Sequence, residues 1–180
     1  MTIYLATDHA GYQLKEKIKK FLAERGHEVK DFGALEYKED DDYPDFVKPA
    51  AEAVSKCAQR FPGRPVIASE TKQSYNSANV RSPRSDQEAG ARDDSCKAIV
   101  FGGSGQGEAM VANRYKGVRA AVLYKFDKDI IKLSREHNDA NVLALGARFL
   151  SVRQALKAVE LWLATPFSGE ERHKRRINKF

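Results

Sequence analysis

A glycine-rich heptapeptide, Gly-Gly-Ser-Gly-Gln-Gly-Glu at residues 102–108, has the residue types best suited to chemistry in this sequence. Glycines let backbone N–H groups approach an anion closely, and a string of such donors at a helix N-terminus can bind phosphate or a developing oxyanion. The heptapeptide lacks the Lys-Ser/Thr ending of a P-loop and the third glycine of the dinucleotide fingerprint. A tight strand-to-helix turn, an anion cradle and a dinucleotide site therefore all stay open on the glycines alone.

Glu108, the carboxylate that ends the heptapeptide, limits the kinds of reaction that this loop could support. At a helix N-terminus it could simply interact favourably with the helix dipole. In a phosphate-binding pocket, however, a carboxylate repels the ligand, so its presence there indicates proton transfer. Burial raises the pKa of a carboxyl group toward the working pH, which is what a general base requires.

Two further polar groupings flank predicted strands: Asp8-His9 follows the first strand, and His137-Asn138 lies at the end of a helix before the last strand. Ligands of open α/β sheets bind beyond the carboxyl ends of the strands. We expect both groupings to meet the glycine-rich loop there, and this convergence is the main physical argument for a site. The alternative for His9 and His137 is a structural role, because a lone histidine is more often a hydrogen-bonding partner than a functional group.

Apolar runs and helical periodicity alternate along the chain and predict the elements that position these residues. The predicted strands cover residues 3–6, 27–32, 98–101, 118–123 and 142–145, and the predicted helices 12–25, 45–56, 108–114, 127–136 and 152–165. Strands that alternate with helices imply right-handed crossovers and a parallel sheet covered on both faces. The predicted fold is α/β, a Rossmann-like three-layer α/β/α sandwich with a five-stranded parallel sheet, in a single domain over residues 1–180.

The stretch from about 57 to 94 interrupts this rhythm, because it is rich in Ser, Pro, Arg, Asn and Gln and has almost no apolar face. A structureless loop of this length inside a compact domain is uncommon unless it is inserted or disordered. We interpret it as a flexible surface insertion. A partner-binding or regulatory segment is the alternative.

The composition excludes several other classes of protein. The chain has 180 residues, a net charge of +6 and two cysteines, Cys57 and Cys96, which lie outside any CxxC or His-rich cluster. A zinc site is therefore not expected, and a chain of this size needs no disulfide or metal to fold. The first residues do not have the pattern of a signal peptide, and no apolar run reaches the ~20 residues of a membrane span. We expect a reduced, cytoplasmic protein.

The positive charge gathers near the C-terminus, in residues 172–176 and Lys179. Nucleic acid is one possible partner of such a cluster, but the segment lacks the interleaved aromatic residues of a single-strand binder. A solvated helix end or a site for a small anion explains it equally well. We expect neither nucleic acid nor membrane as a partner.

The chain resembles ribose-5-phosphate isomerase type B, in the group that includes the galactose-6-phosphate isomerase subunits. The resemblance rests on several motifs in the same order: Asp8-His9-Ala10-Gly11, Asp42-Tyr43-Pro44, the heptapeptide 102–108, Ala112-Asn113, residues 135–142, Gly146-Ala147-Arg148 and residues 172–176. Together they extend over nearly everything except 57–94. Many family members carry a cysteine base where this chain has Gly102, so the chain resembles the subgroup in which the glutamate is the base.

The resemblance implies interconversion of ribose 5-phosphate and ribulose 5-phosphate through an enediolate, without a metal or an organic cofactor. The implied catalytic residues are Glu108 as the base, His137 with Asp8 for opening the furanose ring, and Ser104 for a hydroxyl contact. Implied substrate contacts are Asp8, His9, Tyr43, Gly103, Ser104, Gly105, Gln106, Gly107, Asn138, Arg148, Arg172 and Arg176. Arg148, Arg172, Arg176 and His9 are expected to clamp the phosphate, since guanidinium groups match phosphate oxygens.

The resemblance also implies a homodimer with sites shared across the interface, with a tetramer as the alternative. Three other functions stay open on the sequence. They are isomerisation of a six-carbon sugar phosphate such as allose or galactose 6-phosphate, a sugar-phosphate-binding module without catalysis, and a basic nucleic-acid binder.

Overall fold

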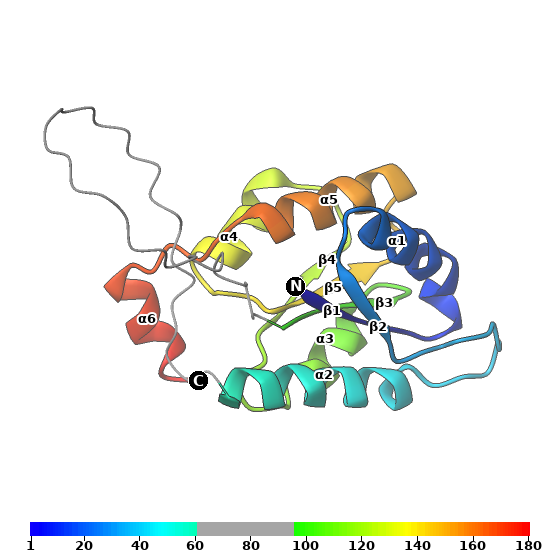
Figure 1. Cartoon of the computed structure of the whole chain (residues 1–180), viewed down its shortest axis with the longest axis horizontal. Coiled ribbons are helices and arrows are strands. Elements are labelled where there is room, and N and C mark those ends of the chain that lie inside the picture. Colours follow the sequence, from blue (N-terminus) through cyan, green and yellow to red (C-terminus); the bar gives the residue numbers. More distant parts are fainter. Residues whose placement is uncertain (61–95) are drawn as a thin grey trace, which may run out of the picture.

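The computed structural model describes residues 1–60 and 96–180, and these contain a five-stranded parallel sheet (Figure 1). Its strands are β1 (Thr2–Thr7), β2 (Glu28–Asp31), β3 (Lys97–Gly102), β4 (Ala120–Leu123) and β5 (Val142–Gly146). Their order across the sheet is β2-β1-β3-β5-β4, and every neighbouring pair is parallel. The predicted α/β class and the five parallel strands are confirmed.

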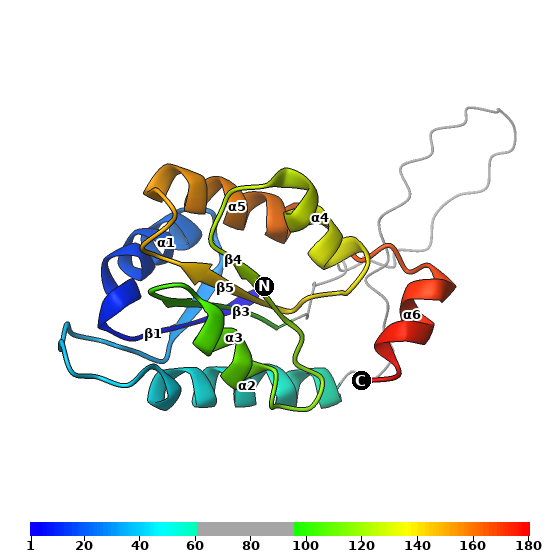
Figure 2. The same cartoon turned by 180° about the vertical axis from the view of Figure 1, so that it is seen from behind.

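Helices cover both faces of the sheet, which gives the three predicted layers (Figures 1 and 2). One face carries α1 (Tyr12–Glu24), α4 (Lys128–Glu136) and α5 (Val152–Ala164), and the other carries α2 (Tyr43–Arg60) and α3 (Gln106–Ala112). A 3₁₀ turn, η1 (His9–Gly11), joins β1 to α1. The last helix, α6 (Glu171–Ile177), lies away from both layers.

The central strand β3 explains why the two helical layers differ. Ile99 and Phe101 enter the core beneath α1 and α5, whereas Ala98 and Val100 face α2 and α3. All four side chains are essentially buried. Because successive strand residues point to opposite faces, the bulky residues gather on one side and the small ones on the other. Small residues let α2 and α3 approach closely, which holds the N-terminal turn of α3 beside the end of β3.

Helix α2 is longer than the sequence predicts and reaches Arg60, so Cys57 lies in the helix. There it forms a disulfide with Cys96, just before β3, with the two Cα atoms 6.0 Å apart. The expectation of unpaired, reduced cysteines is therefore wrong in this structure. The reason is tertiary: α2 ends at the edge of the sheet where β3 begins, which a sequence separation of 39 residues conceals. The rest of the predicted insertion lies outside the described residues.

We expect reduction of this disulfide to lower the stability of the folded chain. The cross-link restricts the unfolded chain, and for a loop of this length it contributes roughly 2–4 kcal/mol to the free energy of unfolding. Urea unfolding with and without dithiothreitol measures the difference. The Cys57→Ser/Cys96→Ser variant is the control, because its midpoint must not respond to the reductant. Equal midpoints for the oxidised and reduced protein would contradict the expectation.

Candidate active site

The glycine-rich loop connects β3 to α3 and ends at Glu108. Gly105, the N-cap of α3, has φ of 78°, a left-handed conformation that favours glycine. The helix begins at Gln106, two residues before the predicted start, so Glu108 lies in its first turn and is 4% exposed. This buried position is unusual for a carboxylate without a paired charge.

The Glu108 carboxylate lies directly over Gly102, the last residue of β3. A Cβ atom on Gly102 would overlap with both carboxylate oxygens, so a side chain at this position has no room. A Cβ atom on Gly107 would lie 2.6 Å from the Tyr43 hydroxyl oxygen, which puts Tyr43 against the same turn of α3. The space beyond the end of β3 is therefore filled by the Glu108 carboxylate.

Asp8 lies beside this carboxylate, since Thr7 pairs with Phe101 across β1 and β3. Its Oδ1 accepts a hydrogen bond from the Ala10 backbone N–H at 3.0 Å, which caps η1, and the residue is 7% exposed. Burial raises the pKa of Glu108, and the nearby Asp8 charge raises it further. Burial also raises the pKa of Asp8 itself. Two neighbouring buried carboxyl groups are typical of a site that transfers protons.

The position of the acidic limb of activity tests this pairing. For Glu108 to act as a base, as the sequence predicts, it must be ionised, so we expect kcat/KM to fall as the pH drops through its raised pKa. Asp8→Asn removes the charge that contributes to this increase. We expect the limb to move to lower pH, whatever the variant does to the maximal rate. Glu36→Gln, at an exposed carboxylate paired with Lys38, is the matched control and leaves the limb in place. An unchanged limb in Asp8→Asn would contradict the coupling.

His9 is held by an aspartate that the sequence analysis did not select. Asp41 Oδ1 accepts from the His9 backbone N–H at 2.8 Å and lies 2.9 Å from His9 Nδ1. This hydrogen bond raises the pKa of His9, which favours the imidazolium form. The only signal for Asp41 in the sequence is its place in an acidic run just before Tyr43.

Arg148 completes the group at the carboxyl edge of the sheet. It follows β5, and its backbone N–H donates to the Gly103 carbonyl at 3.1 Å. A Cβ atom on Gly103 would lie 3.4 Å from Arg148 Nε, so the arginine side chain runs alongside the glycine-rich loop. The structure thus brings together the predicted residues Asp8, His9, Tyr43, Gly103, Ser104, Gly105, Gln106, Gly107, Glu108 and Arg148.

The remaining predicted residues lie at the opposite edge of the sheet, so the expected convergence within one chain is wrong. Helix α4 starts after β4 and returns to the beginning of the parallel neighbour β5, so His137 and Asn138 lie at the amino edge. His137 stacks on His173 of α6, with ring centroids 4.1 Å apart. Figures 1 and 2 show α6 next to the end of α4, on the far side of the molecule from the loop between β2 and α2.

The turn that carries His137 and Asn138 is fixed by two arginines. Asp139 has φ of 45°, and its carboxylate accepts from Arg119 at 2.7 Å and from Arg135 at 2.9 Å. Arg119 Nε also donates to the Asn138 carbonyl at 3.1 Å. These charge-assisted bonds hold a backbone conformation that a non-glycine residue rarely adopts. Arg135 and Asp139 belong to one of the motifs in the sequence, but nothing in the sequence indicates that they hold this turn.

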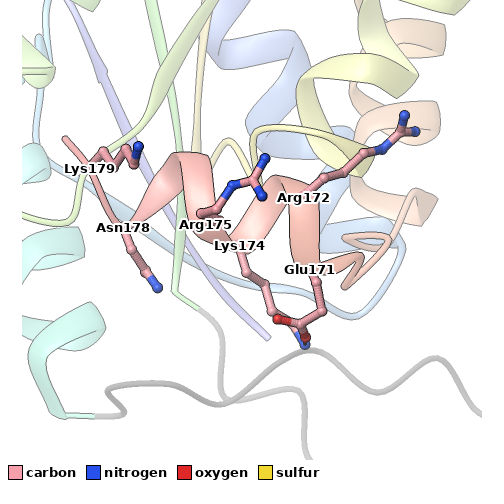
Figure 3. Close-up of a pocket in the computed structure, with 6 residues that line it drawn as sticks. All are labelled: Glu171, Arg172, Lys174, Arg175, Asn178 and Lys179. Atoms are coloured by element: carbon pink, nitrogen blue, oxygen red, sulfur yellow. Dashed lines mark hydrogen bonds and ion pairs between the residues drawn. The ribbon is translucent and has the colours of Figure 1, made fainter.

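Helix α6 contributes a cationic surface at this second edge. Glu171, Arg172, Lys174, Arg175, Asn178 and Lys179 line an open hollow of about 640 Å³ (Figure 3). Lys174 pairs with Glu171 at 2.9 Å, and Arg172 pairs with Glu170 at 2.7 Å. Figure 3 shows the Arg172 side chain pointing to a different side of the helix from the Glu171–Lys174 pair.

Metal sites and membrane-spanning helices are both absent from residues 1–60 and 96–180. This part of the chain has no group of three or more His, Cys, Asp or Glu side chains arranged to hold a metal ion. Its helices also include none that is both long and apolar enough to cross a membrane.

Comparisons with known proteins agree with one another. The chain matches the model of a family described as Ribose/Galactose Isomerase over residues 3–62 and 70–180. It is 36% identical over 178 residues to ribose-5-phosphate isomerase B of Mycobacterium tuberculosis H37Rv, an alignment that covers 99% of this chain and 86% of that relative.

Solved structures of related proteins indicate the same family. A Mycoplasma genitalium ribose-5-phosphate isomerase B with bound ribulose-5-phosphate has a TM-score of 0.75 and 31% identity, covering 99% of this chain and 92% of that one. The Clostridium thermocellum ribose-5-phosphate isomerase B has a TM-score of 0.74 and 36% identity, with 99% and 94% covered. The chain therefore belongs to the ribose/galactose isomerase family.

Proposed function

We propose that this protein is an aldose–ketose isomerase that interconverts D-ribose 5-phosphate and D-ribulose 5-phosphate, with Glu108 as the base. The observation that carries the proposal is the buried Glu108 carboxylate over Gly102, at the end of β3. Support for the substrate comes from relatives named ribose-5-phosphate isomerase B and from a structure of one with ribulose-5-phosphate. The reaction belongs to the pentose phosphate pathway.

The chemistry needs one base that works in both directions. Glu108 removes the C2 proton of the open-chain aldehyde, the electron pair forms a C1–C2 double bond, and negative charge develops on O1. Returning the proton to C1, while the O2 hydroxyl proton passes to O1, leaves the ketone at C2. A carboxyl group with a raised pKa returns the proton more readily than an ordinary one.

The glycine-rich loop stabilises the charge that develops on the enediolate. Its backbone N–H groups over residues 103–107 are oriented by the start of α3, and the Ser104 hydroxyl adds one more donor. Preorganised donors of this kind commonly contribute about 3–4 kcal/mol to transition-state stabilisation. His137 opens the furanose ring, and Asn138 holds a sugar hydroxyl or the enediolate.

A homodimer accounts for the separation of these residues. Each complete site then has two halves. One subunit supplies the carboxyl-edge half, with Glu108, Asp8, His9 and Arg148. The partner supplies the amino-edge half, with His137, Asn138, Arg172 and Arg176. Each dimer holds two complete sites, and the phosphate is clamped by arginines from both subunits. A symmetric dimer is the simplest assembly that completes both sites at once.

A coupled assay on ribose 5-phosphate, beside allose 6-phosphate and galactose 6-phosphate, tests the proposal. We expect the highest kcat/KM on ribose 5-phosphate. A higher value on either six-carbon substrate would assign the chain to the other branch of its family. Binding of all three without turnover would indicate a sugar-phosphate-binding module.

A further inference from the structure

A second hollow, of about 320 Å³, lies between α1 and the segment that follows β5. His9, Gln13 and Lys17 form one wall, spaced four residues apart so that they share a face from η1 into α1. Arg148 and Tyr37 also line it, and the Tyr37 ring lies near that of His9, with centroids 6.3 Å apart. The hollow therefore opens directly from the His9–Arg148 end of the candidate active site.

Lys17 differs from the other lysines of α1. Lys15 and Lys19 both contact Asp31, each at 2.7 Å, and Lys20 lies 3.9 Å from Glu24. Within the described residues, Lys17 has no carboxylate partner, although it lies among these paired lysines on one short helix. Its charge is thus available to a ligand.

The wall of the hollow is positively charged. Besides Lys17 it contains Arg148 and His9, and the hydrogen bond to Asp41 raises the pKa of His9. The described residues that line it include no carboxylate. The charge of His9 is paired with Asp41, so Lys17 and Arg148 are the cationic groups that the hollow offers a ligand. Two such groups hold a phosphomonoester more strongly than one, because charge-assisted contacts are the stronger hydrogen bonds.

We propose that Lys17 is a further phosphate-binding residue, which extends the His9–Arg148 end of the site along α1. This inference rests on the proposed function, since it assigns the hollow to the phosphate group of the same sugar-phosphate substrate. Gln13, between His9 and Lys17 on the same wall, donates its amide N–H to a phosphate oxygen.

The test compares Lys17→Gln with Lys20→Gln. Both variants remove one lysine charge from α1, but only Lys17 faces the hollow. For Lys17→Gln we expect KM for ribose 5-phosphate to rise roughly three- to ten-fold with kcat nearly unchanged, as for a lost charge-assisted contact. The inhibition constant for inorganic phosphate rises by a similar factor. Lys20→Gln changes neither value, and Lys17→Arg restores both because it keeps the charge.

Direct binding of inorganic phosphate keeps this test separate from the proposed function. Phosphate raises the melting temperature of the wild-type protein and of Lys20→Gln, and raises that of Lys17→Gln clearly less. That pattern supports the Lys17 assignment even if wild-type protein fails to isomerise ribose 5-phosphate, a result that would overturn only the proposed function. Equal phosphate responses and equal KM values for Lys17→Gln and Lys20→Gln would overturn the assignment.

Discussion

Glu108→Gln is expected to lower kcat by about a hundred- to ten-thousand-fold while leaving KM for ribose 5-phosphate nearly unchanged, as befits loss of a general base. The amide fits the volume that the carboxylate fills over Gly102, so the loop and the phosphate-binding residues keep their places. In the proposed mechanism one residue moves the proton in both half-steps, so the variant should also stop exchanging the C1 proton of ribulose 5-phosphate with solvent. Coupled kinetics and NMR in D₂O measure the two effects.

The cysteines provide the control for this prediction. Cys57 and Cys96 are joined in a disulfide at the beginning of β3, whereas Glu108 lies beyond its end. Reduction followed by alkylation with iodoacetamide, and the Cys57→Ser/Cys96→Ser substitution, should therefore both leave turnover intact. If Glu108→Gln stayed active while alkylation abolished activity, the base would be a thiol and the mechanism would be wrong.

Mixed dimers should recover activity when the two subunits carry substitutions at opposite edges of the sheet. Glu108→Gln disables the carboxyl-edge half, and Arg172→Ala/Arg176→Ala disables the clamp on α6; each parent dimer is nearly inactive at low substrate concentration. In the mixed dimer, one site contains all three substitutions and the other site contains none. Purified through two different affinity tags, it should show about half of wild-type kcat/KM, since one of two symmetric sites is intact.

The matched control pairs two substitutions at the same edge. Glu108→Gln and Arg148→Ala both affect the carboxyl-edge half, so each site of their mixed dimer carries one of them and neither is intact. That dimer should stay nearly inactive. Activity in the control dimer but not in the first mixed dimer would refute sites shared between subunits. The absence of activity from both dimers would refute them as well.

The sequence by itself determined the layout of elements and indicated Glu108 as the candidate base. A short continuous apolar run, such as residues 98–101, predicts a strand, because a strand buried on both faces of the sheet needs apolar residues throughout. Glu108 was predictable because it follows one of these strands within a few residues of glycine-rich chain. Over so few residues, the backbone cannot carry a side chain far from the end of the strand that precedes it.

Tertiary structure alone decided which functional groups lie near one another. His137 precedes a strand, and whether it meets Glu108 depends on the direction in which α4 crosses the sheet. The pairing of Asp41 with His9, the disulfide between Cys57 and Cys96, and the hollow beside Lys17 likewise join segments distant in sequence.

The physical reason is that a sequence pattern records which face of an element is buried, but not which distant element covers it. The Glu108 carboxylate shows both what a sequence pattern predicts and what it does not. Its place after β3 follows from local chain geometry, whereas its raised pKa depends on burial and on Asp8, which reaches it from a different strand. The candidate base could thus be predicted from its neighbours in the chain, and its electrostatic environment only from its neighbours in space.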